Sequence, residues 1–111
     1  MGLGFIGQEI ARAALRSEEL ELIGAIDSAP SLAGRKISDV LGQPAGTFKV
    51  AKDLRTAIGN RKGVVLLHAT GSKLPQVMDQ LLEAMKLGLS IVSSCEELAF
   101  PYFRHPDLAE T

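Results

Sequence analysis

The pattern of apolar and polar residues predicts two amphipathic helices. Residues 8–20 and 74–87 both repeat apolar positions at helical spacing. The apolar side of the first helix would consist of Ile10, Ala13, Ala14 and Leu15. The second carries Pro75 in its first turn and Gly88 as its C-terminal cap, which are favoured places for these residues.

Other segments have the pattern of strands. We expect strands at residues 21–27, 63–69 and 89–94, and a weaker one at 47–51. The run GVVLLHA at 63–69 is almost wholly apolar and contains β-branched residues, which is typical of a buried parallel strand. Strands that alternate with helices indicate βαβ units and a parallel sheet.

Shorter features fill the remaining segments. Residues 28–46 are rich in Pro and Gly and are expected to be mostly loop, with a short helix at 38–41. Asp53 is expected to be the N-cap of another short helix. A helix beginning at 96–100 would be disturbed by Pro101.

The expected fold class is α/β, a Rossmann-like open parallel sheet with helices on both faces. No linker divides residues 1–111, so we expect one domain. In this fold a strand precedes the glycine-rich turn described below, whereas only Met1 precedes that turn here. We therefore expect the chain to be a fragment that lacks the first strand.

Composition narrows the classes of partner. The chain has 111 residues, with 12 Lys and Arg against 13 Asp and Glu and a net charge of −1. This balance argues against binding to nucleic acid or to an anionic membrane. The longest apolar run, residues 64–67, is far shorter than the roughly 18 residues of a membrane span. Cys95 is the only cysteine, so we expect no internal disulfide and no cysteine cluster that could hold a metal. The lack of a signal-peptide pattern predicts a cytoplasmic protein.

Three glycines form the pattern G-x-G-x-x-G ahead of the first predicted helix: Gly2, Gly4 and Gly7. In a dinucleotide site the first makes a tight turn, the second lets the backbone approach a pyrophosphate, and the third lets the helix pack closely on the sheet. The amides of Phe5, Ile6 and Gly7 would then face the pyrophosphate. The motif is weak alone and gains weight from the helix and strand that follow it.

An acidic residue closes the strand after that helix. Asp27 lies 20 residues after Gly7, the spacing expected of a carboxylate that binds the adenosine ribose hydroxyls. Its charge favours NAD over NADP, because NADP carries a phosphate on that ribose. Arg35 in the next loop could bind such a phosphate, so both cofactors stay open. The alternative is that Asp27 merely starts a turn before Pro30.

The end of the all-apolar strand is a second candidate site. Ligands of open parallel sheets bind beyond the carboxyl ends of the strands, so Ala69, Thr70 and Gly71 would lie on the nicotinamide side. The alternative is an ordinary strand-to-helix turn with Ser72 as N-cap. His68 is expected to be an interior histidine with satisfied hydrogen bonds rather than a catalytic residue.

The last predicted strand leads into a third candidate. Ser94 at its end is assigned to the cofactor site, and the carboxylates of Glu96 and Glu97 follow, which suggests acid/base catalysis near a hydride donor. Only one of the two would enter a site, because neighbours on a helix point about 100° apart. The alternative is an acidic first helical turn. Cys95, with no base beside it, is expected to be a packed residue.

Four stretches together resemble a known family. GLGFIG, the ID that closes the second predicted strand, HATGS, and above all SSCEELAFPYFRHPDLA are similar to the N-terminal domain of dihydrodipicolinate-reductase-like oxidoreductases. Within that group the likeness is strongest to 2,4-diaminopentanoate dehydrogenases and native amine dehydrogenases. It covers essentially the whole chain, and the CEEL…RHP block is its most specific part.

The resemblance implies an enzyme that uses NAD or NADP to interconvert an amine with a ketone and ammonia. It implies that the three glycines hold the pyrophosphate, that Asp27 binds the ribose, and that Glu96 or Glu97 handles ammonia or the imine. It also implies a small amine or imine substrate and a homo-oligomer formed through a C-terminal domain absent from this chain.

Two alternatives stay open. The first is a dihydrodipicolinate reductase that reduces a cyclic imine in lysine synthesis, although such enzymes usually carry a Lys- and His-rich substrate motif in a second domain. The second is a non-catalytic dinucleotide-binding module or an inert fragment, because 111 residues leave no room for a substrate domain.

Overall fold

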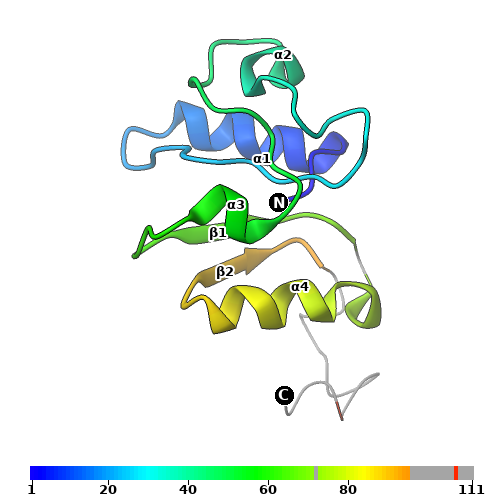
Figure 1. The fold of residues 1–111 in the computed structure, drawn as a ribbon. Helices are drawn as coiled ribbons and strands as arrows, with labels where there is room; N and C mark the ends of the chain where they lie inside the picture. The colour runs from blue at the N-terminus through cyan, green and yellow to red at the C-terminus, as the bar shows by residue number, and fades with distance from the viewer. Residues whose placement is uncertain (72, 96–106, 108–111) are drawn as a thin grey trace. The chain divides into compact units, whose positions relative to one another are not determined.

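The computed structural model describes residues 1–71, 73–95 and 107. The chain divides into two compact units, Met1–Arg61 and Lys62–Thr111. The first contains three helices and the second contains two strands and the helix between them, among the residues described (Figure 1). Each unit is considered by itself.

Helix α1, Phe5–Arg16, is the main helix of the first unit. It begins three residues before the predicted start, directly after Gly4, and ends before the predicted end because Ser17 is extended, with ψ 130°. The buried residues of α1 are Gly7, Ala11 and Ala14, which follow the helical spacing i, i+4 and i+7. Ala13 was expected on the buried side and is exposed, so this prediction is wrong.

Two short helices complete the first unit. Helix α2, Ile37–Leu41, ends at Gly42, whose φ of 68° suits glycine, and helix α3, Leu54–Ile58, begins after Asp53. The Asp53 carboxylate accepts the Thr56 N–H at 2.8 Å, which confirms the predicted N-cap. The core that α1 and α2 share with the loops around them consists of Leu3, Ala11, Ala25, Ile37, Leu41, Ala45 and Val50.

The predicted strands at 21–27 and 47–51 are not regular strands. Isolated bridges join Ile26 with Ala51 in parallel and Lys36 with Lys49 in antiparallel orientation. Backbone pairing of the segment 21–27 is confined to a few residues. Gly2 N–H donates to the Ile26 carbonyl at 2.8 Å on one side of this segment. Ala51 N–H donates to the Ala25 carbonyl at 2.9 Å on its other side. A ladder requires pairing over several successive residues.

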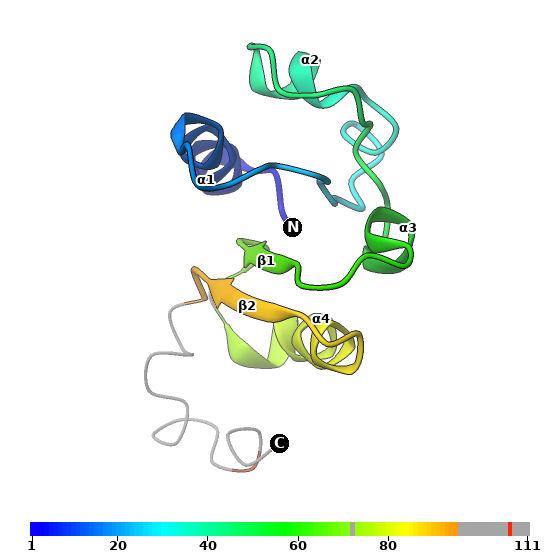
Figure 2. The ribbon, with the colours of Figure 1, turned by 90° about the vertical axis from the view of Figure 1, so that its left-hand side faces the viewer.

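The second unit is a β–α–β arrangement. Strand β1, Val65–His68, and strand β2, Ser90–Ser93, pair in parallel with Val65 opposite Ser90 and His68 opposite Ser93. Helix α4, Leu74–Lys86, joins them and lies beside β2 (Figures 1 and 2). The parallel pairing was predicted and is confirmed.

The core of the second unit lies between α4 and one face of the two strands. It consists of Leu74, Val77, Leu81 and Cys95, with Met78 and Ile91 packed against them. Val65 on the other face is 51% exposed, so the expectation that this strand is buried throughout is wrong in the described structure.

Gly88 follows α4 with φ 77°, as its predicted capping role requires.

The described residues therefore form an α/β structure with a two-stranded parallel sheet. The larger open sheet with helices on both faces stays a prediction. The helix predicted at 96–100 lies outside the described residues. Within the described part of the chain, no helix has both the length and the apolar character needed to cross a membrane.

Candidate functional site

The glycine motif forms a turn that leads directly into α1. Gly2 has φ 88°, a left-handed value that residues with a side chain rarely adopt. Leu3 follows and is 3% exposed, which anchors the turn in the core. Gly4 is the N-cap of α1 with an ordinary φ of −71°, and a β-carbon there would meet no protein atom within 4 Å. The backbone at Gly4 is thus open to approach from outside.

The first turn of α1 carries the features of an anion site. Gly4 has no side chain to cap the helix, and no acidic residue occupies the first turn. The amide groups of such a turn carry a partial positive charge that favours a bound anion. Phe5 is 79% exposed and Ile6 is 54% exposed, while Gly7 is buried.

The Asp27 carboxylate lies against the glycine turn. Oδ2 accepts the Leu3 N–H at 2.9 Å, and Oδ1 accepts the Ala29 N–H at 2.9 Å. The contact with Leu3 joins residues 24 positions apart in the sequence. Each oxygen keeps a lone pair for a further donor, because a carboxylate can accept about four hydrogen bonds. The carboxylate is therefore fixed at the turn and can still bind hydroxyl groups.

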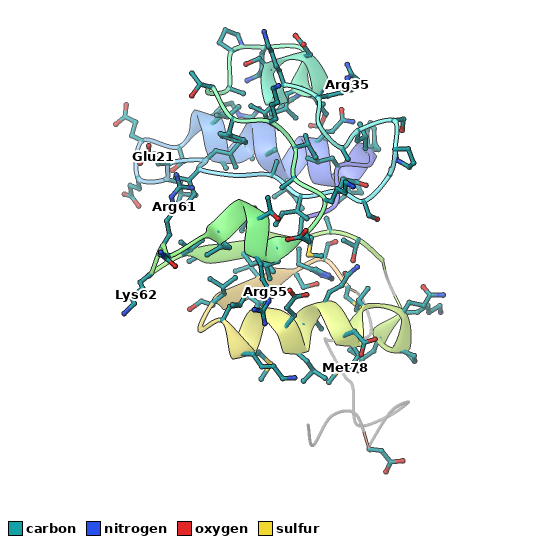
Figure 3. All side chains as sticks on the ribbon, viewed as in Figure 1. Glu21, Arg35, Arg55, Arg61, Lys62 and Met78 are labelled. Carbon is teal, nitrogen blue, oxygen red and sulfur yellow. The ribbon has the colours of Figure 1, made fainter. Side chains whose placement is uncertain are left out.

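Two arginines of this unit lie on or hold the segments around Asp27. Arg35 lies on the loop that follows Asp27, and its side chain is exposed (Figure 3). Its backbone is held by Val50, whose N–H donates to the Arg35 carbonyl at 2.8 Å. Arg61 has a structural role, because its Nη1 donates to the Ile23 carbonyl at 3.2 Å and so holds the segment that leads to Asp27 (Figure 3).

In the second unit, a polar cluster occupies the carboxyl ends of β1 and β2. His68 is fully buried, and its Nδ1 lies 2.7 Å from Ser93 Oγ. Its Nε2 lies 2.8 Å from Gln80 Oε1 and 2.9 Å from Thr70 Oγ1. His68 is thus an interior histidine with satisfied hydrogen bonds, as predicted.

The other residues predicted at this end of the sheet surround the cluster. Ala69 is half-buried and Ser94 is exposed, and Ser94 N–H donates to the His68 carbonyl at 2.8 Å. A β-carbon on Gly71 would lie 3.2 Å from Val77 Cγ1, so glycine allows a tight approach of this turn to α4. The N-cap of α4 is Lys73, with no side-chain hydrogen bond, and not Ser72.

The described part of β2 and its continuation ends just before the predicted catalytic carboxylates. Glu96 and Glu97 lie outside the described residues. Cys95, just before them, is 3% exposed and belongs to the apolar core, as expected of a packed residue. Its N–H donates to Ser93 Oγ at 3.0 Å.

Gln80 and Ser93 were not predicted to take part in a site. A signal for Gln80 was present, because it falls on the side of α4 that also carries Val77, Leu81 and Ala84. A polar residue among buried apolar ones needs a hydrogen-bond partner.

The burial of His68 predicts a pH-dependent stability. Desolvation lowers the pKa of His68 from its ordinary value of 6.5, and the hydrogen bond to Gln80 opposes this only in part. The unfolded chain therefore binds more protons at this site than the folded chain just below pH 6.5. We expect the free energy of unfolding to fall as the pH decreases from 6.5, and a His68→Gln variant to lack this component. Urea denaturation at several pH values measures it, and identical pH profiles of the two proteins would contradict it.

Comparison with known proteins points to one functional class. No family model matches the chain. It is 26% identical over 112 aligned positions to the 2,4-diaminopentanoate dehydrogenase of Acetoanaerobium sticklandii, covering 99% of this chain and 31% of that protein. It is 35% identical over 75 positions to the 4-hydroxy-tetrahydrodipicolinate reductase of Synechocystis, covering 68% of this chain and 24% of that protein. The chain spans less than a third of either relative, and the names of both describe oxidoreductases.

Proposed function

We propose that this chain is the dinucleotide-binding part of an NAD(P)-dependent oxidoreductase. The observation that carries the proposal is the 2.9 Å hydrogen bond from Leu3 N–H to the Asp27 carboxylate. It brings together a glycine turn, a helix N-terminus and an acidic group, which are the three parts that an adenosine diphosphate group requires.

The pyrophosphate is assigned to the amides of Phe5, Ile6 and Gly7. The open backbone at Gly4 supports this, because the diphosphate must come close to the main chain there. The lack of a capping side chain and of an acidic residue in the first turn supports it further, since neither a hydroxyl nor a carboxylate competes for those amides.

The ribose is assigned to Asp27. Its remaining lone pairs accept the two ribose hydroxyls, while the amides of Leu3 and Ala29 hold the carboxylate in place. A phosphate on that ribose would meet the negative charge, so NAD is the preferred cofactor. Arg35 is the group that would let NADP bind more weakly at the same place.

The bound cofactor supplies hydride transfer, and the substrate is assigned to the amine and imine class. Likeness to a diaminopentanoate dehydrogenase along the full chain supports an amine, and Glu96 or Glu97 would handle its proton. The higher local identity to a tetrahydrodipicolinate reductase supports a cyclic imine as the second candidate. Ala69, Thr70, Gly71 and Ser94 are proposed to bind the nicotinamide half, and the intact enzyme is proposed to be a homo-oligomer.

Calorimetric titration of the 111-residue chain with NADH and with ADP-ribose tests the proposal. We expect both to bind with one site per chain, and ADP-ribose to compete with NADH, because the diphosphate and adenosine contacts are common to both. Binding of neither compound to the folded chain would contradict the proposal.

A further inference from the structure

The orientation of the Gln80 side-chain amide decides where each proton of the network around His68 lies. The side-chain carbonyl oxygen of Gln80 can only accept hydrogen bonds. With Oε1 of Gln80 turned toward the ring, His68 Nε2, 2.8 Å away, carries the ring proton, and Thr70 Oγ1 donates its own proton to the same oxygen. Both lone pairs of that oxygen are then used.

The hydrogen-bonding roles on the opposite side of the His68 ring follow from this. A neutral imidazole has one N–H, so Nδ1 is an acceptor, and the Ser93 hydroxyl 2.7 Å away donates to it. Ser93 Oγ in turn accepts the Cys95 N–H at 3.0 Å. Neither hydroxyl of the network has a proton left for a ligand.

One free position remains where a ligand could reach it. Thr70 is exposed, and its oxygen has two lone pairs, of which one receives the shared proton of His68 Nε2 at 2.9 Å. The second lone pair is unused within this network. The Thr70 hydroxyl can thus accept a hydrogen bond from a ligand, and it cannot donate one without losing Gln80 as partner.

We infer that His68 and Gln80 are positioning residues that hold the Thr70 hydroxyl as a hydrogen-bond acceptor, so that this end of β1 takes an N–H or O–H group of the ligand. A carbonyl or phosphate oxygen at this place would face a lone pair and be disfavoured. The inference rests on the proposed function, under which the donor is the carboxamide NH2 of a nicotinamide.

The test compares NAD with its 3-acetylpyridine analogue, in which a methyl group replaces the carboxamide NH2. We expect the chain to bind NAD about 2- to 10-fold more tightly than the analogue, as one neutral hydrogen bond allows. Thr70→Val and Gln80→Met should bring this ratio close to one, whereas Thr70→Ser should keep it. Gln80→Met retains the Thr70 hydroxyl but removes the oxygen that fixes the direction of its proton. This variant therefore separates the positioning of the hydroxyl from its contact with the ligand.

Three outcomes are distinguishable by calorimetry with ADP-ribose as the control. ADP-ribose has no nicotinamide, so its affinity should be equal in the wild type and all three variants. If ADP-ribose binds but the ratio of the two dinucleotides is the same in the wild type, Thr70→Val and Gln80→Met, the inference is overturned and the proposed function stands. If ADP-ribose does not bind, both are overturned.

A spectroscopic measurement tests the proton placement without any ligand. The ¹⁵N chemical shifts of the His68 ring should show a neutral ring protonated at Nε2 near pH 7. A ring protonated at Nδ1 would overturn the inference, because the Ser93 and Thr70 protons would then have to point elsewhere.

Discussion

An Asp27→Asn substitution should largely abolish the preference for NAD over NADP that we propose for this chain. In the wild type the carboxylate is fixed at the turn by two backbone amides, so it cannot swing away from a phosphate on the adenosine ribose. Repulsion between two such charges amounts to roughly 1 kcal/mol at 4 Å in water and about 4 kcal/mol in a partly buried site. We expect the ratio of the NADP and NAD dissociation constants to fall about 10-fold or more, as measured by calorimetry.

The ratio of the two dissociation constants reports cofactor selectivity alone, whereas the substitution also lowers the stability of the fold. An asparagine has one acceptor oxygen, so the amide of either Leu3 or Ala29 loses its partner, and the thermal midpoint should fall. Asp39→Asn is the matched control, since it removes an equal charge from the exposed side of α2 in the same unit. An unchanged ratio in folded Asp27→Asn protein, or an equal change in Asp39→Asn, would contradict the role of Asp27.

A Gly4→Ala substitution should weaken NADH binding about 10-fold or more while lowering the stability of the chain by no more than about 1 kcal/mol, because alanine is a poorer N-cap than glycine. The added methyl group meets no protein atom within 4 Å, and φ of −71° is ordinary for alanine. The substitution therefore introduces neither a steric clash nor backbone strain. The same methyl group would occupy the space through which the diphosphate approaches the backbone. Fluorescence titration with NADH and a thermal melt measure the two effects.

Gly24→Ala is the control for this substitution. It adds the same methyl group to the segment that leads to Asp27, where the nearest atoms belong to Ala57 at 3.7 Å, an ordinary contact. We expect this variant to bind NADH as the wild type does. Unaltered NADH affinity in Gly4→Ala would show that no ligand approaches the backbone at Gly4.

Local chemistry explains which elements could be predicted from the sequence. The Asp53 cap, the helix that opens with Pro75 and the turn at Gly88 each depend on neighbouring residues only, and all three occur. The spacing between Gly7 and Asp27 was informative because a helix followed by an extended return segment has a narrow range of lengths. The Asp27 carboxylate accordingly lies at the glycine turn.

Most of the features that the sequence did not predict correctly depend on residues that are distant in the sequence. The pattern at 21–27 suits a strand, but a strand also needs neighbours, and only Ile26 forms a bridge there. Ala13 does not face the core because neighbouring residues of a helix point about 100° apart, and the adjacent Ala14 is the buried one. Gln80 became part of a polar network because the parallel register places His68 and Ser93 opposite each other, and the register cannot be read from either strand alone.

A two-dimensional ¹H–¹⁵N spectrum of the chain titrated with ADP-ribose would locate the bound compound residue by residue. The largest shifts should occur at the amides of Leu3, Phe5, Ile6 and Gly7 and at Ala29, where we assign the diphosphate and ribose. Saturable shifts centred on α2 or α3, with these five amides unmoved, would rule out this assignment.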